Sequence, residues 1–354
     1  MAAGHVIVVG LVTLLVGAML NAAGLRKTAL SQPVGLRRDI ATAFADPIYD
    51  VSHALYIDRL RQGFKSLLGR SSDDQVDTSL PSPTTVPAGP TPTPTTLPPR
   101  ETFTAAHQLR LWIGGDSLSE VPGDRLIDQA MATGAVGLVG PVDTHISTGL
   151  ARPEVFNWPF YLEAVLTADM PNAVVLTFGA NDDQTLTGDN GGETFGSPQW
   201  ETEYSRRVGG LFDEITSLPS HPRLFMVGIP PVSNAPRFEG HYTVINSIFS
   251  AHAQLRPGRV YYVDTVPVLG TPSGGYQEFA PQLDGTVVQI RTDDGIHVTD
   301  AGGDRVAAKI LSVMREAFNL QSTATTTTTK AHQAKGHRTA GSPTTTTTTT
   351  TAHH

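Results

Sequence analysis

Short apolar runs alternate with amphipathic stretches through the middle of the chain, from Thr104 to Leu320. The apolar runs are nearly continuous, as expected of strands buried on both faces of a sheet; they span 109–115, 173–179, 223–229 and 260–266. Helical periodicity marks the stretches between and after them, at 125–134, 160–169, 203–218, 242–255 and 300–318. Strands that alternate with helices predict one α/β domain, residues 104–320, with a mostly parallel sheet. The glycines at 134, 137 and 140 indicate a turn-rich loop, since they lack the nucleotide-binding fingerprint.

A long apolar run without charged residues lies near the N-terminus, at residues 6–25. About 20 residues at roughly 1.5 Å each match a hydrocarbon core of roughly 30 Å, so the run predicts a transmembrane helix within residues 1–28. A cleaved signal peptide is the alternative, because the small residues of the segment LNAAG resemble a cleavage site. The length of the run and the lack of a basic segment before it favour the uncleaved anchor.

The orientation of this anchor has two conflicting signals. Arg26, Lys27, Arg37 and Arg38 follow the run, and the positive-inside rule would place them in the cytoplasm. The Pro/Thr-rich stretch that comes later is typical of a stalk outside the membrane. We expect the α/β domain to be extracytoplasmic.

The remaining segments are set apart by composition. Residues 29–70 alternate apolar and charged positions, which predicts a juxtamembrane helix, either lying on the membrane surface or without a special role. Residues 71–103 are rich in Pro and Thr and predict an extended linker. Residues 321–354 are Thr-rich and predict a disordered tail, because such a segment cannot bury enough apolar surface to fold.

Composition narrows the chemistry. The chain has no cysteine, which excludes disulfides, Cys-ligated zinc and a thiol nucleophile. The formal net charge of -8 argues against a nucleic-acid partner. We find no His, Asp or Glu cluster with metal-ligand spacing, so neither a metal nor a cofactor is predicted.

Polar and small residues follow the predicted strands, where ligands bind in a parallel sheet. They form the segments GDSL (115–118), STGL (147–150), GAND (179–182) and DGIH (294–297). A serine hydroxyl becomes nucleophilic when a histidine takes its proton and a carboxylate orients the imidazole. Ser117, His297 and Asp294 fit these three roles.

Other residues fit supporting roles. The backbone N–H groups of Ser117 and Gly149, with the side chain of Asn181, could stabilise an oxyanion. Asp293 adjoins Asp294, but its spacing to His297 suits a loop or cap residue better. Substrate contacts are predicted for the side chains of Arg152, Asp182 and Arg291, although an ordinary salt bridge or helix cap explains each of them as well.

In this order the four segments resemble blocks I, II, III and V of the SGNH/GDSL hydrolases, over Leu109 to about Phe318. The resemblance implies a three-layer flavodoxin-like fold, a Ser117–His297–Asp294 triad and an oxyanion hole of Ser117, Gly149 and Asn181. Residues 147–159 and 291–303 are also similar to membrane-anchored bacterial SGNH proteins of the DUF459 type, and the N-terminal region to their actinobacterial members.

These features predict an esterase that hydrolyses an O-acyl ester, such as an acetyl ester, on a small molecule or a cell-envelope glycan. One alternative is an O-acyltransferase that receives its acyl group from a membrane donor protein, since transfer and hydrolysis share the acyl-enzyme. A catalytically inactive envelope-binding protein is the other. A histidine base predicts activity that falls below about pH 6.5.

Overall fold

The structure is a computed structural model, and it describes residues 3–30, 36–55, 57, 80, 99–188, 190–233 and 240–321. The central sheet consists of β2 (Leu109–Gly115), β3 (Val136–Leu138), β4 (Asp143–Thr144), β5 (Ala173–Thr177), β6 (Arg223–Val227) and β7 (Val260–Val263). The main path is β3-β2-β5-β6-β7, with β4 also paired to β2, and all of these pairings are parallel. Along the chain this is the 2-1-3-4-5 order of flavodoxin-like folds.

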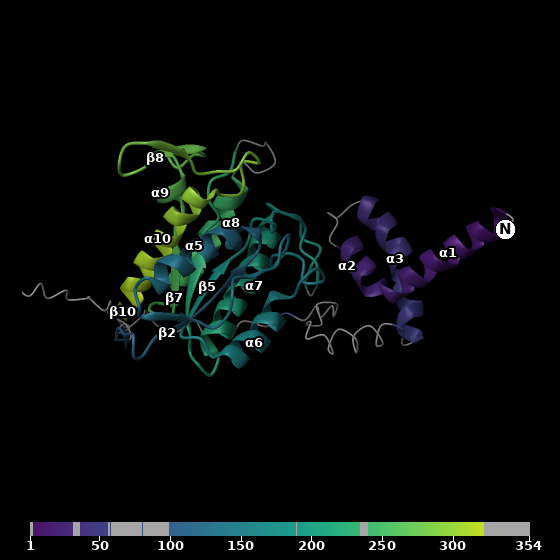
Figure 1. The fold of residues 1–354 in the computed structure, drawn as a ribbon, viewed down its shortest axis with the longest axis horizontal. Coiled ribbons are helices and arrows are strands. Elements are labelled where there is room, and N and C mark those ends of the chain that lie inside the picture. The colour runs from purple at the N-terminus through teal and green to yellow at the C-terminus, as the bar shows by residue number, and fades with distance from the viewer. Residues whose placement is uncertain are drawn as a thin grey trace, which may run out of the picture. The chain divides into compact units, whose positions relative to one another are not determined.

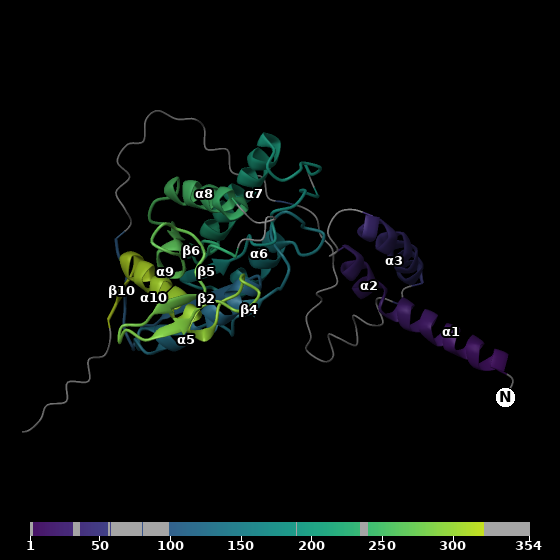
Figure 2. The ribbon, with the colours of Figure 1, turned by 90° about the horizontal axis from the view of Figure 1, so that it is seen from above.

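Helices cover both faces of the sheet (Figures 1 and 2). One face carries α6 (Trp158–Asp169), α7 (Pro198–Ser217) and α8 (His241–Gln254), and the other carries α5 (Glu120–Met131) and α10 (Asp300–Ala317).

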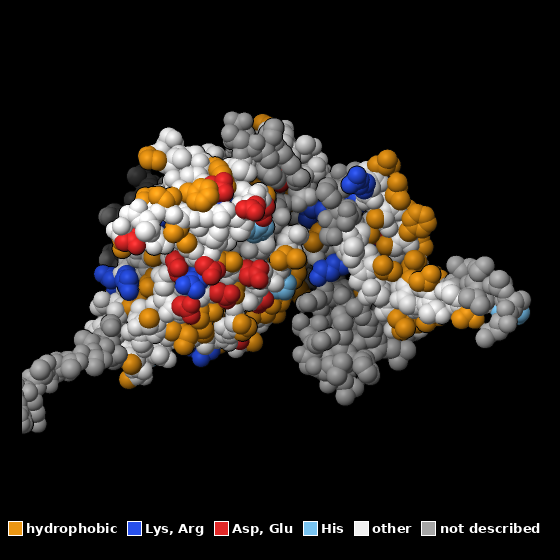
Figure 3. All heavy atoms as spheres, turned by 45° about the horizontal axis from the view of Figure 1, so that its top comes forward, with side chains coloured by type: hydrophobic (Ala, Val, Ile, Leu, Met, Phe, Trp, Pro, Cys, Tyr) orange, Lys and Arg blue, Asp and Glu red, His pale blue; other side chains and the backbone are white. Residues whose placement is uncertain are grey.

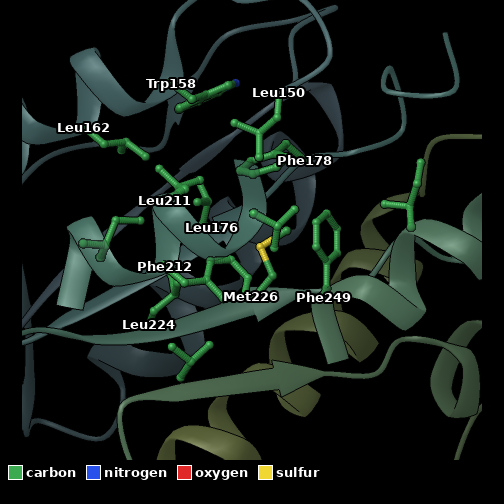
Figure 4. Close-up of a cluster of buried hydrophobic side chains, with 14 of the residues drawn as sticks. Leu150, Trp158, Leu162, Leu176, Phe178, Leu211, Phe212, Leu224, Met226 and Phe249 are labelled. Atoms are coloured by element: carbon green, nitrogen blue, oxygen red, sulfur yellow. The ribbon is translucent and has the colours of Figure 1, made fainter. Parts of the chain in front are cut away.

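The strands serve both layers because successive side chains point to opposite faces. Leu224 and Met226 of β6 pack in the first layer (Figure 4), and Phe225 and Val227 pack in the second. The predicted α/β domain with a mostly parallel sheet is therefore confirmed.

Short elements complete the domain: η1 (Ser117–Ser119), α9 (Val266–Leu269), the antiparallel pair β8 (Phe279–Pro281) and β9 (Val287–Gln289), and the parallel pair β1 (Thr102–Phe103) and β10 (Asn319–Leu320). Phe103 is fully buried in the second layer, so the packed unit includes residues before Thr104. The interpretation of residues 134–140 as a loop is wrong in part, because β3 lies there and pairs with β2. A three-residue strand with a central glycine is too short to leave a periodic signal.

Acidic side chains gather on one face of this domain (Figure 3), in keeping with the formal charge of -8. Some of this charge is paired between the two helices of the second layer. Arg125 of α5 lies 2.7 Å from Asp304 of α10 and 3.6 Å from Asp128 on its own helix.

The N-terminal segment forms α1 (Ala3–Leu20), α2 (Ala22–Leu30) and α3 (Leu36–Ala54), the last within the predicted juxtamembrane region. Among the described residues, no single helix is both long and apolar enough to cross a membrane. Val8–Leu20 and Ala22–Leu30 satisfy that criterion together, but the chain bends by 74° between them. The predicted continuous span is thus not confirmed. Most of the predicted linker 71–103 and nearly all of the tail 321–354 lie outside the described residues.

Candidate active site

The turn after β2 presents Ser117. Gly115 ends the strand with φ +149°, and a Cβ there would lie 1.8 Å from the carbonyl oxygen of Thr177 on β5, so a side chain is excluded. Asp116 then accepts the backbone N–H of Leu118 through Oδ1 at 2.9 Å, which caps the short helix η1. This turn places Ser117 where the strand order reverses between β2 and β5, the position at which ligands bind in such folds.

His297 and Asp294 reach the same point from the loop before α10. The Nε2 atom of His297 lies 2.9 Å from Ser117 Oγ, although the two residues are 180 positions apart. Its Nδ1 atom lies 2.6 Å from Asp294 Oδ2. With Nδ1–H donating to the carboxylate, Nε2 is left to accept the serine proton, which is the geometry of an activated serine.

Asp294 is held in its ionised form by the bonds that it accepts. Partial burial opposes ionisation, but hydrogen bonds from the His297 ring, from Thr292 and from the backbone amides of Ile296 and His297 outweigh that effect. The pKa of Asp294 therefore lies well below its usual range. Asp294 Oδ1 alone accepts three of these bonds, at 2.7, 2.8 and 3.0 Å.

Arg291 anchors this loop from inside the protein. Its fully buried guanidinium donates to the backbone carbonyls of Pro231 (2.5 Å), Ile296 (2.5 Å), His297 (3.2 Å) and Gly295 (3.3 Å). Burial lowers the pKa of Arg291 to about 10. The guanidinium thus faces the backbone that carries His297. The sequence alone leaves both a substrate contact and an ordinary salt bridge open for Arg291.

The predicted oxyanion donors meet near Ser117. The side chain of Asn181 follows β5, and its Nδ2 atom donates to Asp116 Oδ2 (3.2 Å) and to the carbonyl of Thr148 (3.1 Å). Thr148 precedes Gly149 in the segment 147–152, here called the donor loop. The structure therefore brings the donor loop and Asn181 into direct contact beside the serine.

Two buried carboxyl groups lie beneath this contact. Burial raises the pKa of Asp116 to about 7; the Leu118 amide opposes this rise and the negative charge of Asp182 adds to it. Asp182 is also fully buried, and burial raises its pKa against hydrogen bonds from Tyr204, Ala151 and Leu150. Asp116 is not among the predicted site residues, and its signal in the sequence is its position directly before Ser117.

A pocket of about 340 Å³ opens at this place. It is lined by most of the residues singled out from the sequence: Ser117, Gly149, Arg152, Asn181, Asp182 and His297. Arg152 is 5% exposed and donates from Nε to Glu154 Oε1 at 3.2 Å, and burial lowers its pKa. A larger hollow of about 620 Å³ lies beside β8, and none of these residues lines it.

Within the described part of the chain, no group of three or more His, Asp or Glu side chains could hold a metal ion. The pocket brings together reactive side chains and backbone amides. These supply an aligned hydroxyl, imidazole and carboxylate, with amide donors from Asn181 and the donor loop beside them.

In this parallel α/β domain the serine segment follows β2, and the aspartate and histidine come later, in the loop before α10. The family model described as "Protein of unknown function (DUF459)" matches residues 110–313, more than half of the chain, and the chain belongs to that family. A search of curated proteins found no match.

Several solved structures are similar to this chain. A carbohydrate esterase family 3 protein from Talaromyces cellulolyticus is 14% identical with a TM-score of 0.41, over 59% of this chain and 97% of that one. A GDSL-like lipase from Bacteroides thetaiotaomicron is 14% identical with a TM-score of 0.39, over 59% and 89%. The periplasmic domain of a lipopolysaccharide acetyltransferase from Salmonella ser. Paratyphi A is 16% identical with a TM-score of 0.42, over 59% and 84%.

Proposed function

We propose that the protein is a serine esterase that hydrolyses O-acyl esters through an acyl-enzyme on Ser117. The observation that carries this proposal is the continuous line of hydrogen-bonding atoms from Ser117 Oγ to His297 (2.9 Å) and from His297 to Asp294 (2.6 Å). A serine hydroxyl gains nucleophilicity when a histidine oriented in this way accepts its proton.

The reaction follows from the positions of these groups. His297 Nε2 takes the proton of Ser117 while Oγ attacks the ester carbonyl, and the imidazolium that forms is stabilised by Asp294. The carbonyl oxygen becomes an oxyanion, and it replaces the Thr148 carbonyl as an acceptor for Asn181 Nδ2, beside the N–H groups of Ser117 and Gly149. His297 then gives the proton to the leaving alcohol, and a water molecule releases the acyl group by the reverse steps.

The lining of the pocket favours a small acyl group on a polar alcohol. Hydroxyl, amide and carboxyl side chains from Ser147, Thr148, Asp183 and Gln184 accompany the reacting groups. Such a lining suits the many hydroxyls of a sugar better than a hydrocarbon chain, because buried polar groups need hydrogen-bond partners. We therefore propose an acetylated glycan as the substrate class. The Pro/Thr-rich stretch before the domain is typical of a stalk outside the membrane, so we also propose an extracytoplasmic location and a glycan of the cell envelope.

The test is p-nitrophenyl acetate hydrolysis by the purified full chain, compared with Ser117→Ala. The matched control is Ser119→Ala, because Ser119 lies in the same turn but its hydroxyl bonds to the Asp116 carbonyl and to Thr144. We expect hydrolysis by the wild type and by Ser119→Ala, and none above background by Ser117→Ala. Full activity of folded Ser117→Ala would overturn the proposal.

A second measurement separates hydrolysis from transfer. The side chain of His297 is 40% exposed, so a sugar hydroxyl could also approach the acyl-enzyme. Mass spectrometry of reactions with added sugar acceptors distinguishes free acetate, expected for an esterase, from an acetylated sugar, expected for an O-acyltransferase. A folded wild-type chain that never reacts with a serine-directed phosphonate would instead indicate an inactive binding protein.

A further inference from the structure

The donor loop rests on a buried carboxylate. Asp182 is fully buried and accepts the backbone N–H of Leu150 at Oδ2 (3.1 Å) and that of Ala151 at Oδ1 (2.7 Å). Tyr204, reaching in from α7, donates its hydroxyl to the same Oδ2 at 2.6 Å. The carboxylate thereby fixes the two residues that directly follow Gly149.

The opposite edge of the same two residues is also held. Arg207 lies one turn after Tyr204 on α7, and its side chain is fully buried. Its Nη1 donates to the carbonyls of Leu150 (2.8 Å) and Ala151 (3.2 Å), while Nε pairs with Glu203 at 2.9 Å. The N–H groups of Leu150 and Ala151 therefore donate to Asp182, and their C=O groups accept from Arg207.

Gly149 fits closely against this arrangement. A Cβ added at Gly149 would lie 2.1 Å from Asp182 Oδ1, which is far inside contact distance. The loop backbone can approach the carboxylate this closely because glycine has no side chain. Gly149 thus permits the short distance between the donor loop and Asp182. In the proposed function, the N–H of this same residue donates to the oxyanion.

Burying a carboxylate, a phenol and a guanidinium carries a large desolvation penalty, and apolar side chains would support a loop without it. Buried charged groups of this kind are expected where a functional site requires a fixed backbone geometry. We propose that Asp182, Tyr204 and Arg207 form a clamp that positions the Gly149 N–H for the oxyanion. They act on the reaction through the donor loop, and this inference rests on the esterase function proposed above.

The central test is Asp182→Asn in the full chain. An asparagine keeps the volume but presents an NH₂ group to a backbone N–H that needs an acceptor, so the loop must shift. A misplacement of about 1 Å costs about 10²-fold in rate. We expect kcat/KM for p-nitrophenyl acetate to fall about 10²-fold with an unchanged KM. Phenylboronic acid, which mimics the tetrahedral intermediate on Ser117, should bind more weakly by the same factor.

A graded variant and a matched control separate positioning from general stability. Tyr204→Phe removes one donor and leaves both loop amides bonded, so we expect a smaller loss, about tenfold. Asp213→Asn breaks another ion pair on α7, in which Asp213 meets Arg256 twice at 2.7 Å, away from the donor loop. This control should lower Tm without changing kcat/KM or the affinity for phenylboronic acid.

Amide hydrogen exchange over the donor loop adds a readout that does not need activity. Exchange at Leu150 and Ala151 should quicken in Asp182→Asn and stay unchanged in Asp213→Asn. If Asp182→Asn keeps wild-type exchange, kinetics and boronic-acid affinity, or if Asp213→Asn loses as much activity, the clamp is overturned. A wild type without esterase activity would refute the proposed function instead, and exchange would still decide whether the clamp holds the loop.

Discussion

Replacing Asp294 by Asn tests the role of the carboxylate with little change of shape. Asp294 Oδ1 accepts bonds from Thr292, from the Ile296 amide and from the His297 amide, and an asparagine oxygen can keep all three. Only Oδ2, which lies 2.6 Å from His297 Nδ1, becomes an NH₂ group. The loop should therefore keep its conformation, and Tm should change little.

The effect on the imidazole is much larger. Facing an NH₂ donor, Nδ1 has to act as an acceptor, so the ring proton moves to Nε2. Nε2 then points a hydrogen at Ser117 Oγ, 2.9 Å away, and cannot accept the serine proton. From this loss of the productive tautomer we expect kcat to fall about 10⁴-fold. That factor corresponds to about 5.5 kcal/mol in the activation free energy.

The assay is p-nitrophenyl acetate hydrolysis at saturating ester, with Tm measured on the same samples. Asp293→Asn is the matched control, because it removes the neighbouring charge, which accepts a bond from Gln289 at 3.2 Å. This control should retain wild-type kcat. The reasoning is refuted if Asp294→Asn stays within about tenfold of wild type. Equal losses in the two variants would also refute it.

Three further outcomes follow from the same geometry. Asn181→Ala should lower kcat about 10²- to 10³-fold with little change in KM, since one oxyanion donor is lost; steady-state kinetics would contradict this if KM alone rose. Gly149→Ala should lower the free energy of unfolding by about 1–3 kcal/mol, because the added Cβ lies 2.1 Å from Asp182 Oδ1; an unchanged denaturant midpoint would argue against the packing described. For Asp116, whose pKa rises from 3.8 to about 7 on folding, the folded state retains a proton that the unfolded state releases. Its contribution to stability is therefore complete below pH 3.8 and is lost, by about 4 kcal/mol, as pH rises to about 7. Thermal unfolding across this window should be less pH-dependent in Asp116→Asn, and parallel wild-type and variant profiles would exclude that linkage.

The parallel sheet was predictable because its strands are buried on both faces and leave continuous apolar runs. The run at 109–115 coincides with β2, and that at 173–179 contains β5. The carboxyl ends of parallel strands share one edge, so the segments that follow them could be expected to meet there. The 2.9 Å approach of Ser117 and His297 agrees with that expectation.

Other features depend on the fold itself. The sequence marks Arg291 as a cation close to His297, and only the packed structure reveals that it is directed at backbone carbonyls. The apolar run at residues 6–25 has the length and composition of one span, yet a 74° bend separates its two helices. Composition fixes the apolarity of a segment but does not fix whether its helix continues through a polar position such as Asn21.

The two carboxyl groups beneath the site combine a position that the sequence marks with a burial that only the fold reveals. Asp116 and Asp182 each stand directly beside a predicted functional residue, Ser117 or Asn181, and both are fully buried. An ordinary core would exclude them, because an ionised carboxylate loses its hydration there. Asp116 bonds to Leu118 and Asn181, and Asp182 bonds to the donor loop. These partners adjoin or include the residues proposed as nucleophile and oxyanion donors. For Asp116 and Asp182, full burial and bonding to these groups therefore indicate a support for the site more strongly than a contact with substrate.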